Sequence, residues 1–195
     1  MKKIKVKGVM IILLILLVSV NAYCQELELE NSLNKMKITF NLPAGSCAIP
    51  VSDQTDIIYQ VAFCYPESKY EVRVSFYPIS YIQEQAYDEN IDEFVPIFIM
   101  RILCCIAKEN IHVGKMSEFT SKSAYQEFGA DHGFTALLKG GNSDFCKSYE
   151  YIVVNVLYKK NSGIVIVYFL CNDSDDLDLN SIEFYNAYYC FAFNS

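Results

Sequence analysis

Apolar and polar positions alternate in the first part of the chain with the period of two that is typical of β-strands. Residues 35–43, 56–66 and 70–79 are rich in β-branched and aromatic side chains, and the first two stretches end at a proline or glycine. The short link PESK at 66–69 predicts that the second and third strands form an antiparallel hairpin. The third stretch alternates as a strand with one face in solvent would: Val72, Val74 and Phe76 against Glu71, Arg73 and Ser75.

A helical period replaces this alternation in residues 89–110. Acidic residues come first and a lysine comes near the end, which is favourable for the helix dipole. Arg101 interrupts the apolar run, which is too short for the roughly 20 residues of a membrane span. We therefore expect a helix packed on a sheet. The apolar residues on one of its faces are Phe94, Phe98, Ile102, Cys105 and Ile106.

Strands return in the second half of the chain. Residues 110–130 are polar and predict one or two outer strands, and residues 134–139 predict a short strand. Residues 149–172 predict two apolar strands joined across KKNSG, in which Asn161–Gly163 supply the turn chemistry. A last helix is expected over 176–193.

The order of these elements is β-β-β-α-β-β-β-β-α, give or take a strand. Links of hairpin length predict a mostly antiparallel sheet of about six to seven strands with two main helices packed on it. No repeat or proline-rich linker divides the chain. The fold class is therefore α+β, with residues 36–195 as a single domain.

The N-terminus has the three parts of a secretory signal peptide. Residues 1–7 carry four lysines, residues 9–20 are almost wholly apolar, and a small residue, Ala22, follows. An apolar run of about 12 residues disfavours a retained membrane anchor. We expect cleavage after Ala22, a flexible segment over 23–35, and a periplasmic or extracellular location. Tyr23 disfavours a lipid anchor on Cys24, because a lipoprotein signal has a small residue before the cysteine.

Charge narrows the classes of partner. The chain has a formal net charge of −7, and removal of residues 1–22 with their four lysines lowers it to −11. A surface of this sign argues against nucleic-acid binding, which depends on clustered Lys and Arg, and against docking on anionic lipid.

Eight cysteines in an exported chain indicate disulfides, but eight cysteines allow 105 pairings. Several cysteines lie in apolar stretches, where buried thiols explain them equally well. We expect one or two bridges, or none if the source organism is anaerobic. No zinc-type CxxC pair occurs, so no structural zinc site is expected.

The segment FGADHGFTALLKGG at 128–141 holds the best candidate site. Asp131 and His132 stand together between glycines, where a turn would expose them for binding. An alternative is a small hydrolase that uses His132 with Asp131, but this needs a nucleophile brought in by the fold, and no G-x-S-x-G elbow is present. The other histidine, His112, has no acidic neighbour in sequence.

No cofactor or metal site is predicted. The acidic run at 172–180 begins like a calcium loop, but Ser181 replaces the required glycine and Ala187 the required glutamate. Acids at the start of a helix explain the run better. No phosphate-binding motif is present.

Several tyrosines in polar surroundings indicate either recognition or cross-strand packing. We therefore expect an exported, non-catalytic domain that binds a protein or a cell-envelope component. The tyrosines are Tyr77, Tyr81, Tyr87, Tyr125, Tyr149 and Tyr151.

Three stretches carry a resemblance to a known fold. They are ITFNLPAG at 38–45, the turn FGADHGFTALLK at 128–139, and the strand pair of 149–172 followed by a helix. Over residues 36–193 this order resembles the PsbP-like α/β/α sandwich and small exported bacterial proteins of unknown function. The resemblance implies binding or assembly without catalysis, and it transfers no functional residue to this chain.

Overall fold

The computed structural model describes residues 27–52, 55–87, 90–107, 116–141 and 143–194. The predictions for the signal peptide, Cys24 and His112 lie outside these residues. No helix among the described residues has the length and hydropathy that a membrane crossing requires.

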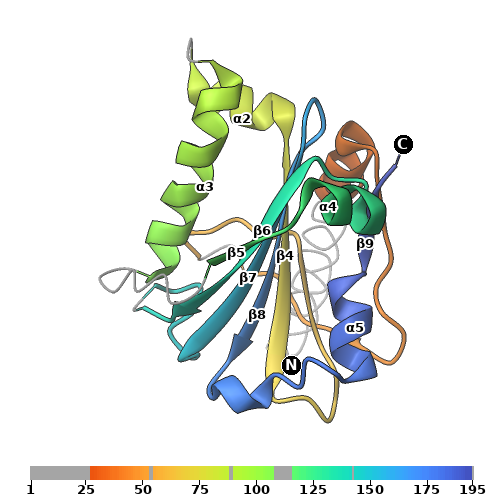
Figure 1. Ribbon diagram of the computed structural model, residues 1–195. Coiled ribbons are helices and arrows are strands. Elements are labelled where there is room, and N and C mark those ends of the chain that lie inside the picture. The colour runs from red at the N-terminus through yellow and green to blue at the C-terminus, as the bar shows by residue number, and fades with distance from the viewer. Residues whose placement is uncertain (1–26, 53–54, 88–89, 108–115, 142, 195) are drawn as a thin grey trace, which may run out of the picture.

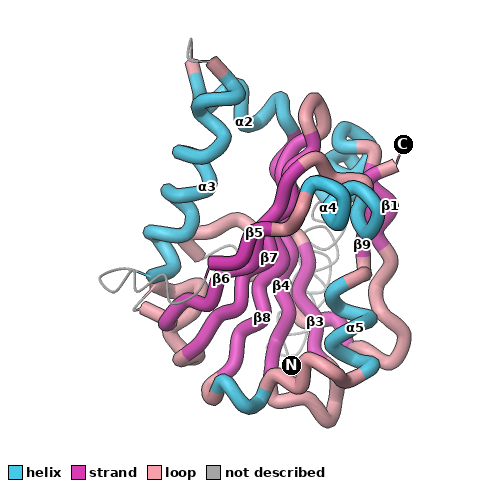
Figure 2. The backbone as a smooth tube through the Cα atoms, in the orientation of Figure 1, coloured by secondary structure: helices cyan, strands magenta, loops and turns pink. Residues whose placement is uncertain are grey.

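A seven-stranded antiparallel sheet forms the middle layer, in the order β2-β3-β4-β8-β7-β6-β5 (Figure 2). Its central strand β8 is buried along its whole length, because both faces of the sheet are covered. Alternate residues of β8 pack into two different cores, Ile164 and Ile166 on one face and Val165 and Val167 on the other. The strands are β2 (Cys47–Ala48), β3 (Val61–Cys64), β4 (Tyr70–Pro78), β5 (Met116–Glu118), β6 (His132–Lys139), β7 (Tyr151–Lys159) and β8 (Gly163–Cys171).

Helices cover both faces of the sheet, as Figure 1 shows. Helices α2 (Ile79–Ala86) and α3 (Ile91–Ala107) lie over the first face and bury Phe94, Phe98 and Leu103 there. The second face is covered by a helix over residues 27–36 and by α4 (Ser121–Phe128) and α5 (Ile182–Tyr188). A two-stranded sheet of β1 (Ile38–Phe40) and β9 (Phe191–Phe193) completes this layer, and a short 3-10 helix, η1 (Ser174–Asp176), follows β8.

The α+β class and the mostly antiparallel sheet are confirmed, with seven strands in the main sheet. The predicted hairpins are confirmed as well, since β3 pairs with β4 and β7 with β8. Asn161 has the positive φ of 65° that the predicted turn requires.

Several elements differ from the sequence prediction. The stretch predicted as outer strands contains β5 but continues as helix α4, because Thr120 caps the helix by accepting a hydrogen bond from Ser123 N. The helix expected over 176–193 is limited to α5, which Ser181 caps, and the chain then extends into β9. Helix α2 was not predicted. Residues 27–36 form a helix where a flexible segment was expected, since Leu29, Leu33 and Met36 pack on the second core.

Strand β4 differs from its predicted half-solvated form. Glu71 and Arg73 are largely buried, because the loop that carries Phe145 and Tyr149 packs over them. Ser75 is fully buried, and its hydroxyl donates to Ile58 O. The seven described cysteines are free thiols, so the expected disulfides are not formed in this structure.

Candidate functional site

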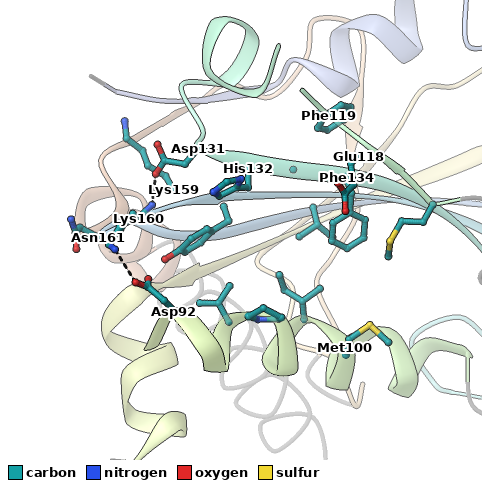
Figure 3. A pocket seen from close by; sticks show the side chains of 17 residues that line it. Asp92, Met100, Glu118, Phe119, Asp131, His132, Phe134, Lys159, Lys160 and Asn161 are labelled. Carbon is teal, nitrogen blue, oxygen red and sulfur yellow. Dashed lines mark hydrogen bonds and ion pairs between the residues drawn. The ribbon is translucent and has the colours of Figure 1, made fainter. Parts of the chain in front are cut away.

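A cleft of about 1030 Å³ lies between helix α3 and strands β5, β6 and β7 (Figure 3). We call it the α3–β5 cleft. Its apolar lining residues are Val95, Pro96, Ile99, Met100, Met116, Phe119, Phe134 and Val156, and its polar or charged ones are Asp92, Glu118, Asp131, His132, Tyr158, Lys159, Lys160 and Asn161; Gly133 completes the lining.

The register of the strands builds the sheet side of the cleft. Glu118 on edge strand β5 lies opposite Phe134 of β6, which lies opposite Val156 of β7. His132 likewise lies opposite Tyr158. Because alternate residues of a strand share a face, His132 and Phe134 project to the same side, toward α3.

The turn between β7 and β8 forms the charged end of the cleft. Lys160 Nζ lies 2.8 Å from Asp92 Oδ2 on α3, and this ion pair joins the helix to the sheet at an exposed position. The hydrogen bond to Asp92 raises the pKa of Lys160 above its ordinary value. Lys159 turns away from the cleft and donates to Asn194 O at 2.7 Å.

Asp131 and His132 both line the cleft, but they do not act on each other. The Asp131 carboxylate accepts a hydrogen bond of 2.7 Å from Lys160 N, and Asp131 N donates to Tyr158 O. Asp131 therefore holds the neighbouring turn in place, whereas the His132 side chain is exposed. No hydrogen bond joins the two side chains in the part of the chain that the structure describes.

The hydrolase alternative would also need a nucleophile beside His132. No serine, threonine or cysteine is among the described residues that line the cleft. A catalytic relay of this kind needs a nucleophile, a base and an orienting group within hydrogen-bond reach of one another. The cleft thus has an apolar floor and polar groups at one end.

Tyr158 lines the cleft beside the charged residues of the turn. Its hydroxyl is buried, and it has no hydrogen-bond partner among the described residues. Burial, and then the nearby charge of Asp92, raise the pKa of this phenol. A buried hydroxyl without a partner is costly.

The sequence pattern missed Asp92, Glu118, Tyr158 and Lys160 as residues of the site. They come from α3, β5, β7 and the following turn, so only the tertiary fold brings them together. Of the tyrosines that indicated recognition, Tyr87 and Tyr125 are exposed, whereas Tyr77 is buried in packing.

The acids of residues 172–180 serve the local backbone. Asp173, Asp176 and Asp178 each accept a hydrogen bond from a backbone N–H in the same segment. Within the described ranges, no group of three His, Cys, Asp or Glu side chains is arranged to hold a metal ion.

No protein-family model matches the chain, and no curated protein matches it. Among solved structures, the chain is similar to the solution structure of cyanobacterial PsbP (CyanoP) from Synechocystis sp. PCC 6803. The sequence identity is 15%, the match covers 82% of this chain and 88% of that chain, and the TM-score is 0.48. At this identity the likeness concerns the fold alone.

Proposed function

We propose that this chain is an exported, non-catalytic domain that binds an extended, apolar segment of a partner protein in the α3–β5 cleft. The N-terminal pattern of residues 1–22 supports export. The observation that carries the proposal is the open cleft, with its apolar floor, beside a sheet edge.

The apolar floor favours a ligand with apolar side chains. Met100 and Met116 line the cleft from opposite sides and are 40% and 44% exposed. Methionine side chains are flexible and polarizable, and they are common on surfaces that receive apolar groups of partners. Covering them would remove exposed apolar area from water.

The sheet edge favours a protein segment as the ligand. Strand β5 is last in the sheet order, and its three residues are exposed. An exposed edge strand offers unpaired N–H and C=O groups, with which an extended peptide can pair as an added strand. Side chains of that peptide would then point alternately toward the cleft, next to Met116 and Glu118.

The charge of the cleft and of the chain favours a partner segment with basic residues beside its apolar ones. In the cleft, Lys160 is matched by Asp92, and Asp131 is bonded to a backbone N–H, whereas Glu118 is exposed. The whole chain carries a net charge of −7. A partner segment flanked by Lys or Arg is therefore attracted to this face.

The test uses fluorescent peptides of alternating leucine and threonine, flanked either by arginines or by glutamates, and measures binding by anisotropy. We expect the arginine-flanked peptide to bind about fivefold to tenfold more tightly. Met100→Lys places a charge in the cleft and should weaken binding at least about tenfold. The matched control is Ile97→Lys, because Ile97 lies on the same helix, is 46% exposed and does not line the cleft.

Failure of both peptides to bind, or equal loss in the Met100 and Ile97 variants, would contradict the proposal. A second assay addresses catalysis. If the chain turned over p-nitrophenyl acetate and the His132→Ala variant did not, the non-catalytic part of the proposal would be wrong.

A further inference from the structure

Two of the described cysteines face each other across neighbouring strands. Cys47 of β2 and Cys64 of β3 are paired directly in the antiparallel register. Directly opposite residues of such a pair have Cα atoms about 4.5–5.5 Å apart. This separation lies inside the range of about 4.4–6.8 Å that a disulfide spans.

The other described cysteines lack this arrangement. Cys104 and Cys105 are neighbours on helix α3, and helix neighbours point in different directions. Cys146 is buried, and its Sγ donates to the backbone oxygen of Ile106. Cys171 is paired in register with tyrosines of β4 and β7, and Cys190 is buried.

Accessibility also differs between the two facing thiols. Cys47 is exposed, so a reagent in solution reaches it, whereas Cys64 is partly buried. Burial raises the pKa of Cys64, with smaller contributions from Cys47 and from the carboxylate of Glu71. Cys64 is thus a poorer first nucleophile and is suited to the second, intramolecular step.

We propose that Cys47 and Cys64 form a disulfide when the chain meets a disulfide oxidant. The Cys47 thiolate attacks one sulfur of the oxidant RS–SR, and RS⁻ leaves and takes up a proton. The Cys64 thiolate then attacks Cys47 Sγ in the mixed disulfide and expels the second RS⁻. The two protein thiols lose two electrons and two protons in total, and the oxidant becomes two RSH.

The Cys47–Cys64 disulfide would link edge strand β2 covalently to β3. Strand β2 is a two-residue, exposed edge strand. A shift of this strand would bring the two Cβ atoms to the separation of about 3.5–4.5 Å that a disulfide requires. The disulfide would fasten the segment that leads to Ile57 and Tyr59, which pack in the core beneath α3. The inference is independent of the α3–β5 cleft, since neither cysteine lines it.

The chain offers a direct readout, because the tryptic peptide 38–69 contains both cysteines and no internal Lys or Arg. After equilibration of the folded chain, residues 23–195, with oxidised glutathione, free thiols are alkylated and the digest is measured by mass spectrometry. We expect peptide 38–69 to lack alkylation and to be lighter than its reduced form by two hydrogen atoms. Oxidation should also raise the Tm by roughly 5–10 °C, as expected for a loop of this length.

Two variants complete the test. Cys47→Ser should abolish both the mass change and the difference in Tm between oxidised and reduced protein, whereas Cys104→Ser should retain both. Full alkylation of peptide 38–69 after equilibration with oxidised glutathione would overturn the proposal. A bridge from either residue to a different cysteine would overturn it as well.

Discussion

At the scale of single residues, Arg73 and Glu71 form a largely buried ion pair. Arg73 Nε lies 2.5 Å from Glu71 Oε1, and the exposed fractions of the two side chains are only 12% and 13%. The guanidinium also donates to Phe145 O and lies 5.0 Å from the ring centroid of Tyr59. Glu71 accepts a further bond of 2.6 Å from Tyr149 Oη.

Sequence pattern alone predicted these residues to face solvent. The alternation in β4 is real, and it assigns Val72 and Val74 to one face and Glu71 and Arg73 to the other. Alternation cannot reveal what covers the polar face, because Phe145 and Tyr149 are more than 70 positions away in the chain. The same limit applies to Asp131, whose partner Lys160 N comes from a different turn.

We predict that Arg73→Met lowers the free energy of unfolding by about 3–5 kcal/mol, because it leaves the Glu71 carboxylate buried without its charge partner. Adding Glu71→Gln to this variant should restore part of the loss. Urea denaturation measures both. Lys139→Met is the control, because its pair with Glu150 is exposed, and it should cost at most about 1 kcal/mol. A loss of that small size in Arg73→Met would show that the buried pair does not stabilise the fold.

At the scale of elements, helix α4 shows which local evidence identifies a helix in a polar stretch. Thr120 caps its start, and Gly129 ends it in the left-handed conformation with φ of 66°. Both residues were visible in the sequence, but the stretch has few apolar residues, and only Ala124 and Phe128 are buried. Periodicity is a weak guide for a short helix of this kind, and the caps are the better evidence.

We predict that Gly129→Ala destabilises the chain by about 2–4 kcal/mol. A Cβ at this position would lie 2.5 Å from the backbone oxygen of Phe193, in addition to the strain of the left-handed conformation. Gly45→Ala is the matched control, because Gly45 also has positive φ, at 80°, and a Cβ there meets nothing within 4 Å. It should cost only about 1 kcal/mol. Urea denaturation measures both variants. Equal losses of stability would show that the close approach to the backbone oxygen of Phe193 in β9 does not add to the cost of Gly129→Ala.

At the scale of the whole molecule, the layered fold could be predicted from the sequence, but the pairing of β1 with β9 could not. The alternating strands and the amphipathic helix of 89–110 predicted a covered antiparallel sheet, which is the observed middle layer. The pairing of β1 with β9 joins the N-terminal and C-terminal parts of the described chain and places Ile38 opposite Phe193. Strands of three residues so far apart carry no local evidence of their pairing, and burial of Phe191 and Phe193 in the second core stabilises it.

Tyrosines are distributed through both cores, and this couples the stability of the whole molecule to alkaline pH. Burial raises the pKa of Tyr77 to about 12 and that of Tyr168 well above its ordinary value. On the second face, burial raises the pKa of Tyr70 to about 12. In each case the folded state favours the protonated, neutral phenol.

The sign of the pH dependence follows from the protons bound in each state. Unfolded tyrosines lose their protons near pH 10, while the buried ones retain them, so the folded state binds more protons and stability falls as pH rises above 10. For Tyr77 alone, the loss between pH 9 and pH 11 is about 1.3 kcal/mol. We therefore predict that, between pH 9 and pH 11, the free energy of unfolding falls by about 1.3 kcal/mol less in Tyr77→Phe than in the wild type. Tyr87→Phe is the control, because Tyr87 is 91% exposed, and its stability should follow that of the wild type. Parallel curves for wild type and Tyr77→Phe, measured by urea denaturation at each pH, would mean that the Tyr77 phenol is not held protonated by the core.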